Sequence, residues 1–540
     1  MSGEAWPPFD PLDHPFPSRR VTVFARKGMV ATSQPLAAAA GLQALLKGGN
    51  AVDAAVAAAA ALTVVEPTSN GIGSDAFAII CHGGTLYGLN ASGPAPAALS
   101  RDAVAGLGFR AMPARGWIPV TVPGAPAAWA QLADRFGRLP LTETMAPAVD
   151  YAEHGYPLSP VLARYWDGAF RAYRRTAEPL LDAWFAAFAP SGRAPRAGEM
   201  WRSPGHARTL QSIAESGARS FYTGEIAERI DAASRAAGGF LRAEDLAAFQ
   251  PEWVTPISVP YRDHEVWELP PNGQGLVALM ALNILSGWDL ASLPPAESVH
   301  LQLEAIKHAF ADGRQTITDP RDMRVAVADL LSPAYGEERR RAIGPGAAIP
   351  APGRPAQGGT VYLATADADG TMVSYIQSNY MGFGSGVVIP DTGIGLQNRG
   401  HTFSLDPAAA NCLEPGKRTY HTIIPGFLTR QGVPVGPFGV MGGFMQPQGH
   451  VQVVLHTVDH GRNPQATLDA PRWQWLEGRR IALEAFPDEG VADLEARGHA
   501  VGRDADPAAF GRGQIIWRDP VSGVLAGATE PRTDGTVAAF

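Results

Sequence analysis

The chain reads GPGAAIPAPGRPAQGG at residues 344–359 and TVYLATADADGTMVSYIQSN at residues 360–379, and this change of character decides the fold. The first stretch is almost all Gly, Pro and Ala, which holds neither a helix nor a strand, so it predicts a surface loop. The second has two β-branched and aromatic runs, 360–366 and 371–378, on either side of the turn signal Asp-Ala-Asp-Gly. It predicts a β-hairpin whose first strand begins at Thr360.

A threonine at the head of a strand, behind a loop that can be cut, has the features of a nucleophile. Cleavage of the peptide bond between Gly359 and Thr360 would give Thr360 a free α-amino group beside its own hydroxyl. Such an amine has a pKa of about 8, low enough to act as a base near neutral pH. A threonine that uses its own N-terminal amine as base is a known solution, because a hydroxyl alone is a weak nucleophile. A loop before an ordinary hairpin would read the same way, so this stretch alone leaves both interpretations open.

Motifs along nearly the whole chain resemble the γ-glutamyltransferase family of N-terminal-nucleophile (Ntn) hydrolases. No single motif is specific, but their agreement in order is, and the sequence is identified as a member of this family. The matching stretches are 28–36, 48–55, 65–67, 71–73, 122–124 with Trp129, 270–271, 283–285, 309–312, 319–320, Thr360, 382–384, 441–443, 470–472 and 530–532.

The resemblance implies a four-layer αββα sandwich, an α/β fold made from two fragments of one precursor. Here the large N-terminal fragment would be 1–359 and the small C-terminal fragment 360–540, with 344–359 as the processing loop. The residues themselves favour the same class, since strands and buried helices occur without a regular βαβ rhythm.

Local patterns predict the elements of this fold. Residues 51–65 are almost uniformly small and apolar after the cap residue Asn50, and a helix that is apolar all round is buried. Residues 125–340 are rich in helical periodicity, and a helix over 449–460 is ended by Gly461. Strands are further expected at 21–31, 76–82 and 85–90, helices at 35–47 and 276–285, and an extended arm at 1–20.

Composition is that of a soluble globular enzyme. With 46% apolar and 18% charged residues and a formal net charge of −8, nothing indicates nucleic acid or an anionic membrane surface as a partner. The two cysteines, Cys81 and Cys412, form no disulfide framework and show no metal-ligand spacing. Residues 1–20 lack the apolar core of a signal peptide, and the longest apolar run, 54–65, is too short to cross a bilayer. We therefore expect a cytoplasmic protein that needs no metal or organic cofactor.

The resemblance also implies the catalytic residues. Thr360 would be the nucleophile in self-cleavage and in turnover, and Ser378 lies where a family hydroxyl assists it. Gly442 and Gly443 match the oxyanion-hole glycines, and a Gly-Gly pair just ahead of a helix can point bare N–H groups at an anion. The residue before the nucleophile is usually polar in the family, whereas here it is Gly359.

Three departures argue against efficient γ-glutamyl recognition. The family's carboxylate-binding Arg is missing, because residues 91–96 read ASGPAP. Thr402 falls near the position of the Asp that holds the α-amino group, and His421-Thr422 replaces a Ser-Ser pair. A charged substrate group without its partner in a closed site costs several kcal/mol.

The variant motifs instead resemble a branch of the family that contains acylases and amidohydrolases, including cephalosporin acylase-like and oxamate amidohydrolase-like members. The run GVVIPDTGI at 386–394 and the run QNRG at 397–400 carry this resemblance. We hypothesise that Arg399 replaces the carboxylate clamp, since a guanidinium forks onto carboxylates, although a structural ion pair would also explain it. Further candidates for substrate binding are Asn398, Thr402, His421, Thr422 and Tyr380.

The sequence therefore predicts an enzyme that cleaves itself between Gly359 and Thr360 and hydrolyses a small-molecule amide through an acyl-enzyme. Its partners would be that substrate and its own two fragments, joined as a heterodimer. A true γ-glutamyltransferase or glutathione hydrolase is the first alternative. A catalytically inactive family member that acts as a binding protein is the second.

Other hydrolase classes have weaker support. His450, His456 and His460 fall near one predicted helix, but no Glu follows His456 as the H-E-x-x-H zinc motif requires. A serine hydrolase would need a G-x-S-x-G elbow, which the sequence does not contain.

Overall fold

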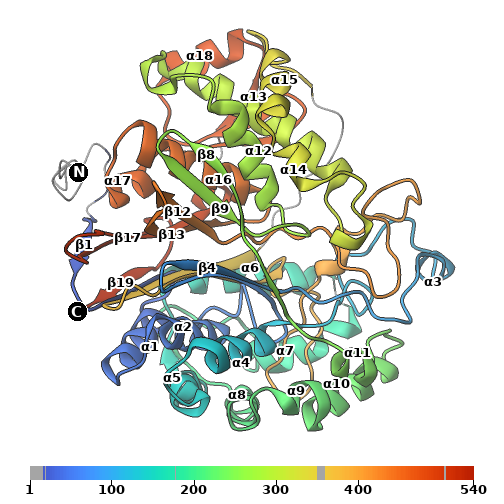
Figure 1. Cartoon of the computed structure of the whole chain (residues 1–540). Coiled ribbons are helices and arrows are strands. Elements are labelled where there is room, and N and C mark those ends of the chain that lie inside the picture. The colour runs from blue at the N-terminus through green and yellow to red at the C-terminus, as the bar shows by residue number, and fades with distance from the viewer. Residues whose placement is uncertain (1–15, 17, 19, 177, 350–358, 504–505) are drawn as a thin grey trace.

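The computed structural model describes residues 16, 18, 20–176, 178–349, 359–503 and 506–540. Most of the predicted N-terminal arm and residues 350–358 of the predicted processing loop lie outside the described residues. Two β-sheets pack face to face and helices cover the outer face of each, which confirms the predicted four-layer αββα sandwich (Figure 1). Within the described chain, no helix has the length and apolar character needed to cross a membrane.

The sheet that carries Thr360, here called the nucleophile sheet, has seven strands, and the second sheet also has seven. In spatial order the nucleophile sheet contains β19 (Thr536–Ala539), β2 (Gly28–Thr32), β10 (Gly359–Asp367), β11 (Met372–Tyr380), β3 (Asp75–His82), β4 (Thr85–Ala91) and β7 (Glu252–Val254). The second sheet contains β1 (Val23–Ala25), β18 (Leu525–Thr529), β17 (Arg512–Arg518), β13 (Val433–Met441), β12 (Gly426–Arg430), β9 (His264–Glu268) and β8 (Ile257–Tyr261). Smaller sheets contain β14 (Trp473–Glu477), β15 (Arg480–Leu483) and β16 (Ala500–Arg503), and β5 (Tyr156–Pro157) with β6 (Met200–Trp201).

Each sheet has its own helical layer (Figure 1). On the side of the nucleophile sheet lie α1 (Pro35–Leu46), α2 (Ala51–Val65), α4 (Ala125–Phe136), α5 (Leu141–His154), α8 (Pro204–Ser216), α9 (Arg219–Thr223), α10 (Glu225–Ala236) and α11 (Ala243–Ala247). On the side of the second sheet lie α12 (Gly275–Leu285), α13 (Pro295–Thr316), α14 (Val327–Leu330), α15 (Pro333–Arg341), α16 (Met445–Val454), α17 (Pro464–Asp469) and α18 (Asp488–Ala496). The described chain also contains α3 (Arg101–Gly106), α6 (Pro160–Thr176) and α7 (Asp182–Phe188).

Helix α2 has the predicted bounds and the predicted burial. The Asn50 side chain accepts hydrogen bonds from the amides of Val52 and Asp53, and the Asp53 carboxylate accepts one from the Asn50 amide. These reciprocal bonds satisfy N–H groups that would otherwise have no partner at the start of the helix. All fifteen residues of α2 are buried, because the helix lies between other helices and the nucleophile sheet.

The predicted hairpin is also confirmed and forms the centre of the nucleophile sheet. Strands β10 and β11 pair antiparallel, and the Asp367 carboxylate accepts from the amides of Asp369 and Thr371 to close the turn. Strand β10 pairs on its other side with β2, and β11 pairs with β3. A register irregularity lies between Gly359 and Val361, so Thr360 sits in a bulge at the head of the strand.

The segments before and after Thr360 do not form separate domains. The nucleophile sheet takes β2, β3, β4 and β7 from the first segment and β10, β11 and β19 from the second. The second sheet is mixed in the same way. Each segment therefore completes the core of the other.

Two elements differ from the sequence prediction. The helix-rich region contains the hairpin β8–β9, whose tight turn includes Arg262 with a φ of +55°. The helix predicted over 449–460 begins earlier, at Met445, and its last residues, Leu455–Asp459, form a π-helical turn. Pro447 does not delay the start, because a first-turn residue has no intrahelical N–H bond to lose.

Candidate active site

Thr360 is buried at the head of β10, in the middle of the nucleophile sheet. Its Oγ1 atom lies 3.0 Å from Ser378 Oγ on β11 and 3.5 Å from Gln446 Nε2. Gly359 and Thr360 are consecutive residues of β10, so the Thr360 nitrogen is part of a peptide bond and the structure is that of the uncleaved chain. The predicted nucleophile and its predicted helper are therefore in hydrogen-bond contact.

The Ser378 hydroxyl links the nucleophile to the backbone beyond it. Its oxygen accepts a hydrogen bond from the Tyr380 amide at 2.8 Å, while either hydroxyl of the Thr360–Ser378 pair can be the donor between them. Tyr380 itself has a φ of +71°, which is uncommon for a residue with a side chain and places its amide toward Ser378. The strand thus bends where its side chains meet the nucleophile.

Gly442 and Gly443 connect the end of β13 to the start of α16, as predicted. Their φ values are +143° and +62°, a region that favours glycine, and among the described residues neither amide has a hydrogen-bond acceptor. The Gly443 carbonyl is held by Gln274 Nε2 at 2.8 Å. Two bare N–H groups at a helix start, one turn before Gln446, are suited to donate hydrogen bonds to an oxyanion beside Thr360.

Three of the predicted substrate-binding residues, Arg399, His421 and Thr422, gather around Asp75. Asp75 Oδ2 lies 3.1 Å from Arg399 Nε and 3.0 Å from His421 Nε2. Arg399 Nη1 donates to Thr422 Oγ1 at 2.7 Å. All four side chains are fully buried, and the guanidinium carbon of Arg399 lies 4.6 Å from the ring centroid of Tyr380. These residues are called the Asp75 cluster below.

The ion pair in the Asp75 cluster leaves some hydrogen-bonding capacity unused. Asp75 Oδ1 and Arg399 Nη2 are buried and have no partner among the described residues. Burial lowers the pKa of Arg399, and the Asp75 carboxylate offsets only part of this effect by stabilising the positive charge. A buried polar atom without a partner costs free energy, so each of these atoms is a candidate contact for a ligand.

His421 is neutral in this cluster. Its Nδ1 atom accepts a hydrogen bond from the Ile423 amide at 3.3 Å, so Nε2 carries the proton that it donates to Asp75. Burial and the neighbouring Arg399 cation lower the pKa of His421 to about 4. Burial also raises the pKa of Tyr380 to about 12, so the phenol next to Arg399 keeps its proton at neutral pH.

Two other predicted substrate-binding residues hold the chain instead of facing open space. The Asn398 amide group accepts from the Met381 N–H at 3.1 Å and donates to the Ala114 carbonyl at 2.8 Å. The Thr402 hydroxyl contacts the carbonyls of Arg399 and Tyr420 at 2.8 and 2.9 Å. Both residues therefore fix the 3₁₀ turn Arg399–Thr402 that presents the Arg399 side chain.

Sequence reasoning missed Asp75, Gln274 and Gln446. Asp75 had a weak signal, because a carboxylate opens the mostly apolar and buried strand β3, two residues after the glycine turn at 71–73. Gln274 lies in the predicted loop at 270–275 and binds the carbonyls of both Thr422 and Gly443. Gln446 gave no signal, since nothing local distinguishes a glutamine in a buried helix.

The histidines considered for a metal hydrolase do not form a ligand set. His450 donates from Nδ1 to Glu268 at 2.6 Å and accepts from the Val440 amide at Nε2, so both ring nitrogens are used. Within the described chain, the one group of three His or Glu side chains with metal-ligand spacing lies elsewhere, at His300, Glu304 and His499.

Comparison with known proteins agrees with the motifs. The Gamma-glutamyltranspeptidase family model matches residues 37–540. The crystal structure of cephalosporin acylase from Bacillus halodurans superposes with a TM-score of 0.95, at 60% identity, covering 98% of this chain and 99% of that one. The glutathione hydrolase-like YwrD proenzyme of Bacillus subtilis is 38% identical, and the oxamate amidohydrolase proenzyme of Klebsiella pneumoniae is 37% identical. Both alignments cover 95% of this chain and 98% of the relative.

Proposed function

The chain belongs to the γ-glutamyltranspeptidase family, and we propose that it is a self-cleaving N-terminal-threonine amidohydrolase of the acylase type. One observation carries the proposal: Thr360 Oγ1 lies 3.0 Å from Ser378 Oγ, and Thr360 directly follows the bond to be cut. The relatives named as proenzymes support the proposal that this chain is also processed.

Self-cleavage is a reaction between the neighbouring residues Gly359 and Thr360. Thr360 Oγ attacks the carbonyl carbon of Gly359, and its proton passes to the Thr360 nitrogen as the C–N bond breaks. The product is an ester between Gly359 and the Thr360 side chain, which water hydrolyses to a Gly359 carboxylate and a free hydroxyl. Thr360 then has a free α-amino group, with a pKa of about 8, that acts as its general base.

Turnover repeats this chemistry on a substrate. The Thr360 amine takes the hydroxyl proton while Oγ attacks the amide carbonyl carbon, and the amides of Gly442 and Gly443 hold the resulting oxyanion. Collapse expels the amine, which receives the proton from the Thr360 ammonium, and leaves an acyl-threonine ester. Water, activated by the same amine, releases the acid; an acceptor amine in place of water would give transfer.

The substrate we propose is a small amide whose acyl part carries a carboxylate. Arg399 Nη2 is a buried donor without a partner among the described residues, and its guanidinium is suited to bind a carboxylate. Asp75 is already balanced by Arg399, and Thr402 uses its hydroxyl on the backbone, so neither offers the uncompensated charge that an α-ammonium group requires. The names of the acylase and amidohydrolase relatives are in keeping with this class.

The two fragments would remain together as a heterodimer after cleavage. Strand β10 from the small fragment lies between β2 of the large fragment and β11, and β11 pairs with β3 of the large fragment. Separation would expose both buried sheets to water, which the hydrophobic effect strongly opposes.

A matched series of anilides tests the proposal. Glutaryl-, γ-glutamyl- and valeryl-p-nitroanilide share one leaving group, and the glutaryl compound differs from the γ-glutamyl one only by the missing α-amino group. We expect kcat/KM for the glutaryl compound to exceed both others at least about tenfold, the worth of one charge-assisted hydrogen bond. Arg399→Lys keeps the positive charge beside Asp75 but loses the fork, so it should reduce the preference for glutaryl over valeryl.

The same series tests the alternatives. A clear preference for the γ-glutamyl compound, with Asp75 Oδ1 accepting its ammonium group, would support a glutathione hydrolase instead. Chain that is never cleaved and hydrolyses none of the three would support an inactive family member that acts as a binding protein.

A further inference from the structure

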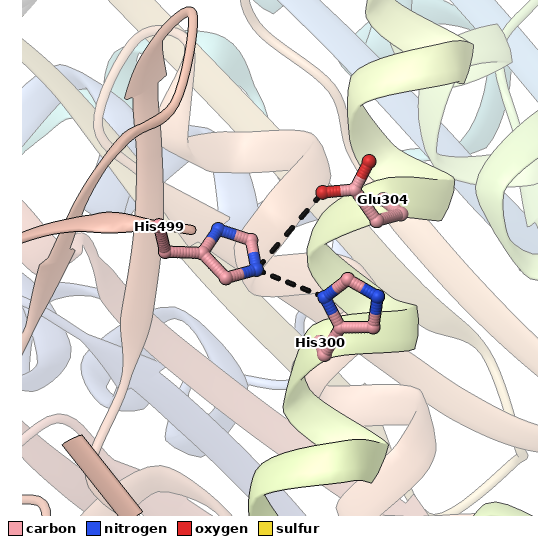
Figure 2. Close-up of side chains that lie close together, drawn as sticks. All are labelled: His300, Glu304 and His499. Atoms are coloured by element: carbon pink, nitrogen blue, oxygen red, sulfur yellow. Dashed lines mark hydrogen bonds and ion pairs between the residues drawn. The ribbon is translucent and has the colours of Figure 1, made fainter. Parts of the chain in front are cut away.

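A second buried polar cluster lies far from Thr360, on the outer side of the second sheet. His300 and Glu304 project from α13 toward His499, which lies just before β16 (Figure 2). Lys307 also belongs to α13, one turn beyond Glu304. His300 Nδ1 lies 2.9 Å from His499 Nε2, and Lys307 Nζ lies 2.7 Å from Glu304 Oε1. His499 Nε2 and Glu304 Oε1 are 4.0 Å apart, and all four residues are buried.

Three of these side chains bind the backbone of residues 344–348, which lead toward the cleavage site. His300 Nε2 lies 2.9 Å from the Gly344 carbonyl oxygen. The Ala348 amide donates to Glu304 Oε2 at 3.1 Å, and Lys307 Nζ donates to the Ala348 carbonyl at 3.2 Å. Between these points the Ala347 amide donates to a backbone carbonyl at position 497. The segment is therefore held at both of its ends.

These contacts determine which ring nitrogens of His300 and His499 carry a proton. Because a carbonyl only accepts, His300 Nε2 carries a proton for Gly344, and His300 Nδ1 is then the acceptor for His499 Nε2–H. Burial and the nearby Lys307 cation lower the pKa of His499 to about 3, so the His499 ring is neutral. Lys307 places an ammonium group on the Glu304 oxygen that a metal ion would need, which makes the cluster an internal anchor and not a metal site.

We propose that His300, Glu304 and Lys307 are positioning residues for self-cleavage, because they fix the chain that runs into the Gly359–Thr360 bond. Strand β10 fixes the other end of that chain, and ten residues, 349–358, separate Ala348 from Gly359. This inference rests on the proposed function, since it concerns the rate of the cleavage proposed above.

The size of the effect can be bracketed. If every contact of residues 344–348 were lost, including the Ala347 bond to the carbonyl at position 497, the last residue packed on the core before Gly359 would be Ile343. The number of residues between that point and Gly359 would rise from ten to fifteen. Chain entropy alone would then slow cleavage about twofold. Misplacing the scissile bond by about one ångström would slow it about 100-fold. We expect a fall between these limits.

The test compares cleavage rates of freshly made precursor. Lys307→Met and His300→Ala remove two of the contacts, and His308→Ala is the control for the histidine change on the same helix. Ala348→Pro removes the amide that binds Glu304 and leaves every cluster side chain in place, and Ile349→Pro is its neighbouring control. The readouts are the half-time of fragment formation, the Tm of the precursor, and kcat/KM per cleaved molecule.

The expected result is slower cleavage in Lys307→Met, His300→Ala and Ala348→Pro, with normal rates in both controls and unchanged kcat/KM once cleaved. Because Ala348 is exposed and its substitution leaves no cavity, its variant should lower the Tm less than Lys307→Met or His300→Ala does, so slow cleavage in it separates positioning from general destabilisation. Cleavage of Lys307→Met and Ala348→Pro at the wild-type rate would overturn the inference. A cleavage rate that depends on zinc or on EDTA would also overturn it, because the cluster would then be a metal site.

Failure of the anchor and failure of the proposed function are distinguishable. If the wild-type chain is cleaved and every variant is cleaved equally fast, only the proposed positioning role of the cluster is refuted. If wild-type chain is not cleaved at all, or Thr360→Ala is cleaved like wild type, the proposed function itself fails.

Discussion

Asp75 and Ser378 lie directly opposite each other on the antiparallel strands β3 and β11. Side chains of directly opposed residues share one face of a sheet, so Asp75 lies on the same face as the serine that contacts the nucleophile. Through Asp75, the buried side chains of Arg399 and His421 are tied to that face as well. The residues that we propose for substrate recognition and for chemistry are thus joined by one pair of strands.

Because Asp75 contacts both Arg399 and His421, we expect its substitution to lower the stability of the protein strongly. Asp75→Asn would leave the Arg399 guanidinium buried without its counter-ion, which costs about 3–5 kcal/mol of stability. Adding Arg399→Met removes the stranded charge, so the double variant should be more stable than Asp75→Asn alone. Urea unfolding of the uncleaved Thr360→Ala background gives these free energies, and additive losses from the two changes would contradict the coupling.

Ser378→Ala should keep the fold but slow both self-cleavage and turnover. The variant removes the hydroxyl that contacts Thr360 Oγ1, and positioned proton-transfer groups contribute about 10²–10⁴-fold in rate. Ser374→Ala is the matched control, because Ser374 lies on the same strand and face but bonds to Tyr362 instead. Fragment formation on gels and kcat are the measurements, and equal rates for both variants would remove Ser378 from the mechanism.

Gly442→Ala tests the oxyanion hole. An added Cβ would lie 3.1 Å from the Gly511 backbone, and a φ of +143° is unfavourable for alanine, so the amide must move. Displacement of one oxyanion donor predicts a fall in kcat of about 10²–10³-fold. Gly461→Ala controls for backbone strain, because Gly461 also has a positive φ, +61°, but nothing lies within 4 Å of its added Cβ. Comparable losses of kcat in both variants would argue for strain alone.

The neutral His421 predicts a loss of stability in acid. Its pKa is about 4 in the folded chain, below the usual value of 6.5, so the unfolded chain takes up a proton first as the pH falls. The stabilisation is fully present above pH 6.5 and is lost as the pH falls from about 6.5 toward about 4, at up to about 1.4 kcal/mol per pH unit. His421→Gln cannot take up this proton, so in the Thr360→Ala background its unfolding free energy should fall less between pH 6.5 and 5.5. An identical fall in both proteins would show that His421 does not contribute.

The elements that could be predicted from sequence are those with strong local signals. The helix over 51–65 was predicted to the residue, because its cap and its apolar run are adjacent in the chain. The hairpin around the turn at 367–370 was predicted for the same reason. Thr360, Ser378, Gly442 and Gly443 were identified by family resemblance, and the structure places Thr360 and Ser378 in contact.

What could not be predicted depends on contacts between distant segments. Asp75 and His421 are 346 positions apart in the chain, and only the packing of the two sheets brings them together. The anchor made by His300 and His499 joins residues 199 positions apart. The hairpin β8–β9 was missed because its strands are short and lie within a region in which helical periodicity dominates. Local patterns specify elements, whereas these sites arise from register and packing.

The central claim is tested most directly by intact-mass measurement of purified wild-type protein beside Thr360→Ala. We predict two wild-type fragments that meet between Gly359 and Thr360, comprising residues 1–359 and 360–540, and a variant that remains one chain of 540 residues. Wild-type protein that stays whole after long incubation, or a Thr360→Ala variant that is cut at the same bond, would contradict the account.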